Sequence, residues 1–224
     1  MALIIGEALE PALLVSAQEQ FAKLIWQDGT KTAGATARQV KKNLQADLTS
    51  RSGAKLKSLL FAAISGHPVV EAYARPAKWS RLIVSRTEVG GGYGRHIDNS
   101  FMGTGSGEVR TDLSFTLFLS DPESYKGGEL VIEEAGGTRS VKPAAGDLVI
   151  YPSTTLHEVA QVTSGVRYAC VGWIQSRIRQ KDQREILFDL ENLRAELRKQ
   201  HSDNSPELLT LSKSIANLSR MWAS

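Results

Sequence analysis

The chain has 224 residues, with 27 Lys and Arg against 24 Asp and Glu, so its formal net charge is only +3. Hydrophobic residues make up 42% and charged residues 23%, which excludes a wholly disordered or collagen-like chain and allows one large domain with helical additions. The sequence has no dense basic stripe with interleaved aromatic residues and no apolar run of 18 residues, so neither a nucleic acid nor a membrane is an expected partner.

Cysteine usage and the start of the chain bear on the cellular compartment. Cys170 is the only cysteine, which excludes an internal disulfide and any metal site built from several cysteines. The first 15 residues carry Glu7 and Glu10 and lack a basic leader, so they do not predict a signal peptide. We therefore expect a cytoplasmic protein.

Residues 1–77 predict an N-terminal helical region that packs on the core. Apolar residues recur at helical spacing in three segments, which are separated by turn-rich stretches. The predicted helices cover residues 12–26, 35–48 and 54–64.

Residues 78–177 change to short apolar or alternating runs separated by glycine-rich turns. The predicted strands are 79–86, 93–97, 111–119, 129–134, 138–142, 147–151, 157–162 and 166–174. Eight closely spaced short strands indicate an antiparallel sandwich or barrel, for which a jelly roll is the natural candidate. Residues 178–224 predict a C-terminal helical extension with two amphipathic helices. The expected fold class is therefore mainly β with α flanks.

Two of the four histidines lie in the predicted β region in contexts that indicate metal binding. His96 and Asp98 are two residues apart on an extended strand, so their side chains point to the same face. His157 opens a later strand. Two histidines and one carboxylate on one side of a metal leave positions open opposite, which is the arrangement that iron(II) oxygenases use. The His-x-Asp pair alone is a weak signal, because a surface pair would look the same.

Arg167 lies ten residues after His157, across the turn at 163–165. If residues 162 and 166 flank that turn as partners, His157 lies opposite Val171, and Arg167 projects to the same face. The offset between His157 and Arg167 would be roughly 13 Å, a gap that an arginine side chain and a five-carbon diacid on the metal could fill together. The alternative interpretation of Arg167 is an exposed strand arginine.

Four further features allow two interpretations each. Residues 99–108 form either a lid over a substrate or an ordinary exposed loop. Ser114 and Thr116 line a pocket or face solvent, and we favour solvent. Tyr93 and Trp173 belong to a pocket or to the core, and we favour the core for both.

Several motifs carry a resemblance to a known family. They are Trp26–Gly29 with Thr32–Gly34, Val40–Leu44, Tyr93–Asn99, Arg110–Ser114, Gly127–Ile132, Ala145–Asp147, Tyr151–Ser153, and Gln183–Arg184 with Leu187–Leu190. With these motifs, the chain resembles the bacterial PKHD-type hydroxylases, which are iron(II)- and 2-oxoglutarate-dependent dioxygenases related to prolyl 4-hydroxylases. The resemblance covers nearly the whole chain.

The resemblance implies a double-stranded β-helix in which His96, Asp98 and His157 hold Fe(II) and Arg167 anchors 2-oxoglutarate. It also implies O₂ as second co-substrate, binding of L-ascorbate, and hydroxylation of a peptide, amino acid or siderophore-like substrate coupled to decarboxylation of 2-oxoglutarate. Some family members are linked to iron uptake. One departure is Thr87, because many relatives carry a tyrosine after the arginine that here is Arg86.

Two other functions remain open from the residues. A cupin-like isomerase or hydrolase could use the same three ligands for zinc or manganese, although Arg167 has no role in such chemistry. A non-catalytic 2-oxoglutarate or iron sensor could use the C-terminal helices to bind a partner. The apolar faces of the helical flanks also suit a homo-oligomer.

Overall fold

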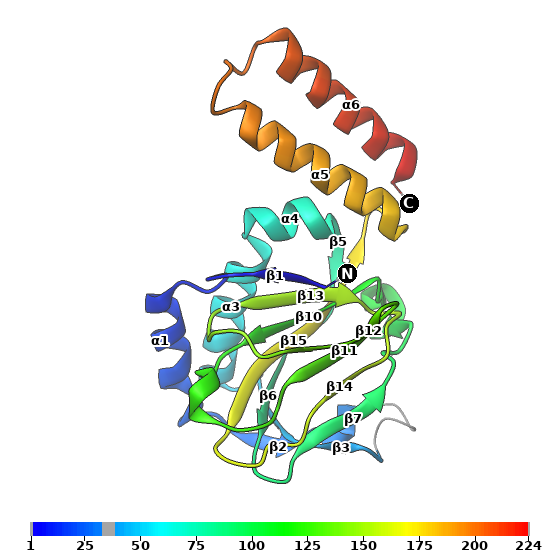
Figure 1. Cartoon of the computed structure of the whole chain (residues 1–224). Helices are drawn as coiled ribbons and strands as arrows, with labels where there is room; N and C mark the ends of the chain where they lie inside the picture. The colour runs from blue at the N-terminus through cyan, green and yellow to red at the C-terminus, as the bar shows by residue number, and fades with distance from the viewer. Residues whose placement is uncertain (1, 33–38, 224) are drawn as a thin grey trace.

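The computed structural model describes residues 2–32 and 39–223, which form two facing β-sheets with helices on one side (Figure 1). The strands are β1 (Leu3–Ile5), β2 (Trp26–Asp28), β3 (Lys41–Lys42), β4 (Leu44–Ala46), β5 (Pro76–Trp79), β6 (Ile83–Thr87), β7 (Gly92–His96), β8 (Phe101–Met102), β9 (Val109–Arg110), β10 (Leu113–Phe118), β11 (Leu130–Glu134), β12 (Gly137–Val141), β13 (Leu148–Pro152), β14 (His157–Val159) and β15 (Arg167–Ser176). The helices are α1 (Pro11–Phe21), α3 (Arg51–Ser65), α4 (Pro68–Ala74), α5 (Lys181–Leu197) and α6 (Pro206–Trp222).

The larger sheet has the strand order β1-β13-β10-β15-β6-β4-β2, with β5 also paired to β15. The smaller sheet has the order β12-β11-β14-β7-β3. Neighbouring strands in both sheets are antiparallel. Between β10 and β15 the chain crosses from one sheet to the other several times, because β10, β13 and β15 belong to the larger sheet and β11, β12 and β14 to the smaller one. This arrangement is the jelly roll that the sequence predicts.

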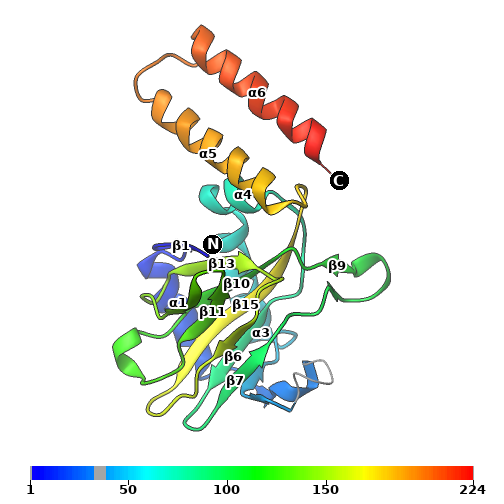
Figure 2. The same ribbon diagram turned by 45° about the vertical axis from the view of Figure 1, so that its right-hand side comes forward.

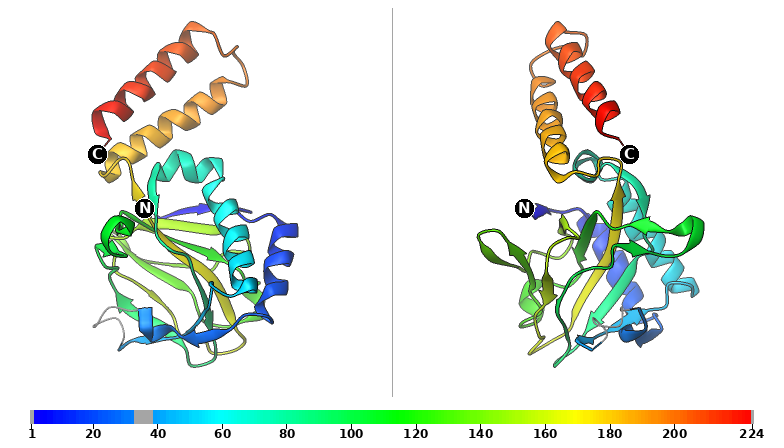
Figure 3. Two further views of the ribbon diagram at one scale, coloured as in Figure 1. Left: turned by 180° about the vertical axis from the view of Figure 1, so that it is seen from behind. Right: turned by 90° about the vertical axis from the view of Figure 1, so that its right-hand side faces the viewer.

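Both faces of the larger sheet are covered, which decides where its polar residues point. Leu113, Phe115 and Leu117 of β10 belong to the main core, in which residues of α1 and α3 also pack. The alternate residues of β10 face the smaller sheet, and among them Phe118 packs with Leu130 of β11. All six residues of β10 are buried. In the left panel of Figure 3, which views the molecule from behind, α1 (blue) and α3 (cyan) lie in front of the larger sheet.

Helices α5 and α6 form an antiparallel hairpin that stands away from the sandwich (Figure 1). Its own small core contains Ile178, Leu187 and Ile215. The Ser205 hydroxyl caps α6 by accepting a hydrogen bond from the Leu208 N–H. At the base of the hairpin, Arg75 Nη2 lies 3.1 Å from Glu191 Oε1 and ties α5 to the end of α4. None of the described helices is long and apolar enough to cross a bilayer.

Most predicted elements are present, but the helix predicted for residues 35–48 is wrong. Residues 41–42 form β3 and residues 44–46 form β4, while residues 33–38 lie outside the described part of the chain. The segment is extended because β3 pairs with β7 at the edge of the smaller sheet and β4 pairs with β6 of the larger one. Strand pairing with two sheets therefore outweighs the helical spacing of the apolar residues in this segment.

The eight strands predicted between residues 79 and 174 are confirmed with shifted ends, and the first of them is two strands, β5 and β6. The segment before residue 78 contributes β1 to β4 as well as helices. The domain boundaries after residues 77 and 177 stay predictions.

Candidate metal centre

Three side chains that commonly bind metals meet at one place between the sheets. His96 ends β7, Asp98 follows two residues later, and His157 begins β14 as the direct antiparallel partner of His96. One ligand atom from each residue lies within 4.8 Å of the other two. His157 Nε2 is 3.7 Å from Asp98 Oδ2, and both side chains are more than nine-tenths buried. The structure therefore brings together the three residues that the sequence singled out, in a cluster that could hold a metal ion.

Backbone carbonyls orient both imidazoles. His96 Nδ1 lies 2.7 Å from the Gly94 carbonyl oxygen, and His157 Nδ1 lies 3.0 Å from the Thr155 carbonyl oxygen. Because a carbonyl only accepts, each Nδ1 carries the proton and donates it. Each Nε2 then keeps its lone pair free for a metal ion. The sequence gives no signal for these two acceptors, because they belong to the backbone.

Asp98 is held by a hydroxyl from the opposite sheet. Ser114 Oγ donates to Asp98 Oδ2 at 2.6 Å and lies 2.7 Å from Ser153 Oγ. The preference for solvent at Ser114 and Thr116 is therefore wrong, since each is only 2% exposed and lines the cavity between the sheets. Alternation of polar and apolar residues on β10 predicted an exposed face, but here the second sheet covers that face.

Burial keeps the His96 imidazole uncharged. Burial and then the nearby His157 lower the pKa of His96 to about 4, so its imidazole is neutral near pH 7. The Tyr93 ring stacks on His96 with ring centroids 3.6 Å apart, and burial raises the pKa of Tyr93 to about 12. Tyr93 lines the cavity, so the preference for core packing at this residue is wrong.

Arg167 lies in the same cavity, on the strand β15 of the larger sheet. Its side chain is only 2% exposed, and neither its Nε nor its Nη2 has a hydrogen-bond partner among the described residues. Its guanidinium carbon lies 5.0 Å from the centroid of the Phe118 ring, and burial lowers its pKa. A buried cation with two unpaired donors is costly, so this is a place where an anionic ligand would stabilise the protein.

The surroundings of Arg167 leave room beside it. Thr87, the residue that departs from the family pattern, is its direct partner on β6 and is buried. Gly128, at a φ of 70°, lies on another side, where a Cβ would come within 2.9 Å of Arg167 Cδ. The Tyr125 ring lies beside Gly128, and Tyr125 and Arg167 are near enough to shift each other's pKa, although no hydrogen bond of normal geometry joins the buried Tyr125 hydroxyl to a described residue.

His157 and Arg167 line one cavity, but the strand pairing that places them there differs from the predicted pairing. The hairpin register that placed His157 opposite Val171 is wrong, because β14 pairs with β7 and β11, whereas β15 pairs with β10, β6 and β5. His157 and Arg167 project from opposite sheets into one cavity of about 910 Å³, a volume that includes its open mouth. Chain reversal at 163–165 thus carries the chain from one sheet to the other.

The remaining predictions have mixed outcomes. Trp173 is 8% exposed, as the core interpretation expects, but it also lines the cavity, and its Nε1 has no partner among the described residues. Cys170 is fully buried on the opposite face of β15. Residues 101–110 form a hairpin of β8 and β9 that projects from the sandwich (Figure 2), and its role as a lid stays a prediction.

Comparison with known proteins decides the family. A PKHD-type hydroxylase of Hyphomonas neptunium is 54% identical over 99% of both chains, and one of Synechococcus elongatus is 44% identical over the full length of both. The chain belongs to the PKHD-type hydroxylases. The model of the 2OG-Fe(II) oxygenase superfamily also matches residues 82–175, a segment that contains His96, Asp98, His157 and Arg167.

Solved structures agree on the fold of this PKHD-type hydroxylase. A Pseudomonas putida prolyl-4-hydroxylase superposes with a TM-score of 0.52 at 18% identity, covering 79% of this chain and 92% of that one. HygX from Streptomyces hygroscopicus, solved with nickel and 2-oxoglutarate bound, gives a TM-score of 0.54 at 13% identity, covering 78% and 82% of the two chains. The protein is therefore a dioxygenase of the 2OG-Fe(II) family, and its reaction class follows from family membership.

Proposed function

We propose that the chain holds Fe(II) through His96, Asp98 and His157 and binds the distal carboxylate of 2-oxoglutarate through Arg167. The observation that carries this proposal is that one cavity contains both the three-residue cluster and a buried guanidinium whose Nε and Nη2 have no partner among the described residues. A dicarboxylate bound to the metal at one end supplies what the arginine at the other end lacks. Arginine is suited to this task because two of its N–H groups can grip one carboxylate.

The donor set fits a ferrous ion with open positions. Two imidazole nitrogens and one carboxylate form the facial arrangement of non-haem iron oxygenases, which leaves sites for two further ligands. When bound, iron(II) with 2-oxoglutarate and O₂ would supply the oxidation that yields succinate, CO₂ and a hydroxylated substrate.

The protein's own residues set the geometry of that chemistry. The carbonyl oxygens of residues 94 and 155 fix the two imidazole rings, and Ser114 fixes the carboxylate. Tyr93 covers one face of the His96 ring. Tyr151 is buried, with its ring centroid 5.0 Å from that of His157, and burial raises its pKa well above 10, so it adds bulk and no charge. These contacts keep the three ligand groups in place.

We infer a peptide or a small molecule as the hydroxylated substrate. A structural neighbour from Trichoplax adhaerens is a prolyl hydroxylase solved with a peptide fragment, and HygX has been solved with hygromycin B, so the fold accommodates both kinds of ligand. Binding of L-ascorbate, a role in iron uptake and assembly through the helical flanks stay predictions from the resemblance.

Succinate formation tests the proposal. Purified protein with iron(II) and 2-oxoglutarate under air should form succinate slowly without a substrate and faster with one. The His96→Ala variant should lose this turnover while its circular dichroism spectrum is unchanged, and His201→Ala, which changes an exposed histidine, should keep it. Turnover of another substrate with zinc but no succinate with iron would favour the isomerase or hydrolase. Binding of 2-oxoglutarate without any turnover would favour the sensor.

A further inference from the structure

A second hollow adjoins the candidate metal centre on the side of the C-terminal extension. It has a volume of about 1340 Å³, including its open mouth, and lies between the loop after β7, the start of β10, the end of β13 and the start of α5. Ile97 and Asp98 line both this hollow and the cavity that contains Arg167. A molecule in the second hollow, which we call the extension groove, therefore ends beside Asp98.

The extension groove carries an excess of positive charge. Its lining includes four cationic side chains, on Arg110, Arg179, Lys181 and Arg184, against two carboxylates, on Asp98 and Asp112. Arg110 and Asp112 neutralise one another, because Arg110 Nε lies 2.8 Å from Asp112 Oδ1. With Asp98 assigned to the metal, the three cations at the start of α5 have no carboxylate partner among the groove-lining residues.

Arg179 and Lys181 are both accessible to a ligand. Both are exposed, and Arg179 forms no ion pair with any residue in the described ranges 2–32 and 39–223. Lys181 lies 3.7 Å from Glu185, one turn further along α5, in an exposed pair that contributes little energy. A ligand anion could displace this contact at small cost.

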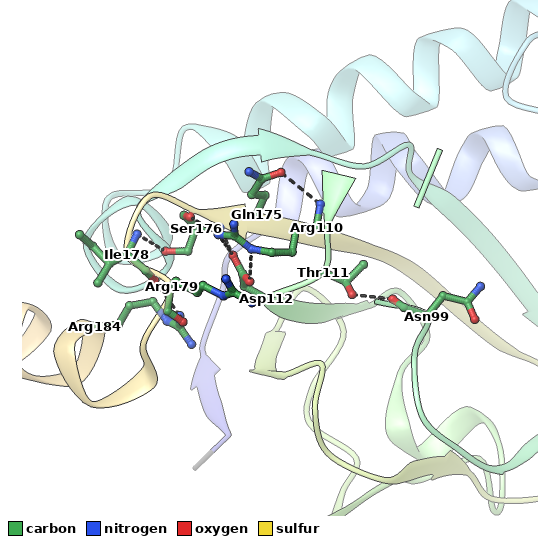
Figure 4. A network of polar contacts seen from close by, with 9 residues as sticks. All are labelled: Asn99, Arg110, Thr111, Asp112, Gln175, Ser176, Ile178, Arg179 and Arg184. Atoms are coloured by element: carbon green, nitrogen blue, oxygen red, sulfur yellow. Dashed lines mark hydrogen bonds and ion pairs between the residues drawn. The ribbon is translucent and has the colours of Figure 1, made fainter. Parts of the chain in front are cut away.

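A buried network holds this end of the groove rigid, and Figure 4 shows it. Arg184 is 3% exposed, and its Nη1 donates to the carbonyl oxygens of Ile178 and Arg179, each at 2.8 Å. Asp112 accepts from the backbone N–H of Ser176, whose hydroxyl accepts from the N–H of Ile178. The backbone that carries Arg179 is therefore fixed relative to β10, the strand that also carries Ser114 beside Asp98.

Part of the groove lining is apolar. Ile97 and Phe101 both line the groove and are 55% and 54% exposed. Exposed large apolar residues beside a rigid cationic site form a surface for a ligand with a hydrocarbon part and an anionic group.

We propose that the substrate carries a carboxylate or phosphate group that binds to Arg179 and Lys181 in the extension groove, with its hydrocarbon part against Ile97 and Phe101 and its reacting carbon beside the metal. This proposal rests on the proposed function, because it takes Asp98 as a metal ligand. It assigns to the C-terminal extension a direct part in choosing the substrate.

Matched pairs of compounds test the charge requirement. Free proline, lysine and acetylated dipeptides are compared with their carboxamides, and phosphoserine carboxamide with serine carboxamide, by the succinate formation that each stimulates. In each pair the partner has a neutral group in place of the anion. The free acids or the phosphate should stimulate at concentrations at least about tenfold lower than these neutral partners, which is the loss expected when charge-assisted hydrogen bonds are removed. The phosphate and carboxylate arms identify the anion, and single amino acids against dipeptides identify the size of the substrate.

A double variant tests whether Arg179 and Lys181 bind the anion. Arg179→Ala with Lys181→Ala should raise the half-saturating concentration of the stimulating anion at least about tenfold and leave the turnover without substrate unchanged. Arg198→Ala with Lys199→Ala removes the same charges from the exposed far end of α5 and should change nothing. The proposal is overturned if neutral partners stimulate equally, if the double variant matches the control, or if no compound stimulates a protein that forms succinate.

A second experiment distinguishes failure of the proposed function from failure of the groove proposal. If the wild-type protein forms no succinate at all, the same pairs are titrated into the metal-free protein and followed by NMR. Acid-specific shifts of the amide signals of residues 179 and 181 that disappear in the double variant would support the groove, and their absence would overturn it.

Discussion

The cavity between the two sheets has one end where polar groups are paired and another where they are not. At the His96 end, both imidazole Nδ1 atoms and the Asp98 carboxylate have short hydrogen bonds within the described chain. At the Arg167 end, two guanidinium nitrogens and the Tyr125 hydroxyl are buried without partners among the described residues. The first end is organised by the chain itself, because a metal ion needs ligand atoms already in place. The second end needs an oxygen-rich ligand to pair its donors.

This comparison predicts that the two ends respond differently to substitution. The metal end should lose chemistry when a ligand atom is removed, and the arginine end should lose binding of the co-substrate. Stability should also differ, because the first end is satisfied without a ligand and the second is not.

The largest effect is expected for His96→Ala. Loss of one of three ligand groups should reduce succinate formation by more than about 100-fold, beyond what loss of a partner outside the coordination sphere costs. Iron binding, measured by retention of metal after gel filtration, should fall in parallel. Turnover within about tenfold of the wild-type value would place the metal elsewhere, since removing even an outer-shell partner can cost that much.

A distinct result is expected for Arg167→Leu. Truncating one partner of a buried charge pair costs at least about 2 kcal/mol, so the KM for 2-oxoglutarate should rise about 30-fold or more. The free energy of unfolding without ligand, measured in urea, should stay equal or increase, because an unpaired buried charge has been replaced by an apolar side chain. A large loss of stability without any change in KM would show that the arginine has only a structural role.

Removing the hydroxyl that holds Asp98 should have a smaller effect. Ser114→Ala should weaken iron binding by about 10- to 100-fold, the usual cost of losing a partner of a metal ligand. Ser153→Ala is the matched control, since Ser153 contacts Ser114 but no recorded contact joins it to Asp98. Equal effects of the two variants would mean that the serine pair supports the fold and does not orient the carboxylate.

The smallest effect is expected for Cys170, which lies on the face of β15 opposite Arg167, and it is tested by the dependence of stability on pH. Burial raises the pKa of the Cys170 thiol to about 12 from an ordinary value of 9.0. Between these values the unfolded chain releases the thiol proton and the folded chain keeps it, so this contribution to stability is present below pH 9 and is lost as the pH rises toward 12. In urea unfolding, the free energy of unfolding of the wild type should therefore fall relative to that of Cys170→Ala as the pH rises from 8 to 10.5. Modification of the folded protein by a thiol reagent at pH 8 would contradict this burial.

Local sequence patterns predicted the metal end of the cavity, because two of its three residues are close together in the sequence. His96 and Asp98 are two residues apart on one strand, and strand periodicity alone puts them on one face. The strands from β10 to β15 were likewise predicted from alternation and glycine-rich turns. The long apolar stripes of α5 and α6 identified both helices of the C-terminal extension.

The features that the sequence did not predict depend on pairing and packing between segments that are far apart in the chain. Whether Ser114 faces solvent depends on the second sheet, which no local pattern on β10 reveals. The segment 41–46 is extended only because two sheet edges are available to it. Arg167 was placed in the correct cavity through a wrong register, because a short turn between two strands usually makes a hairpin, whereas here it joins different sheets. The extension groove needs the start of α5 to lie beside the residues before β10 and the end of β13, and these residues lie far apart in the chain.

A crystal structure with iron(II) and 2-oxoglutarate, grown without oxygen, would show which side chains bind the metal and the co-substrate. We predict a metal ion within about 2.0 to 2.2 Å of His96 Nε2, His157 Nε2 and an Asp98 oxygen, as is usual for nitrogen and oxygen ligands. We also predict the distal carboxylate of 2-oxoglutarate within hydrogen-bond distance of Arg167 Nε and Nη2. A metal bound at other residues, or a co-substrate carboxylate that leaves Arg167 unpaired, would contradict the proposed function.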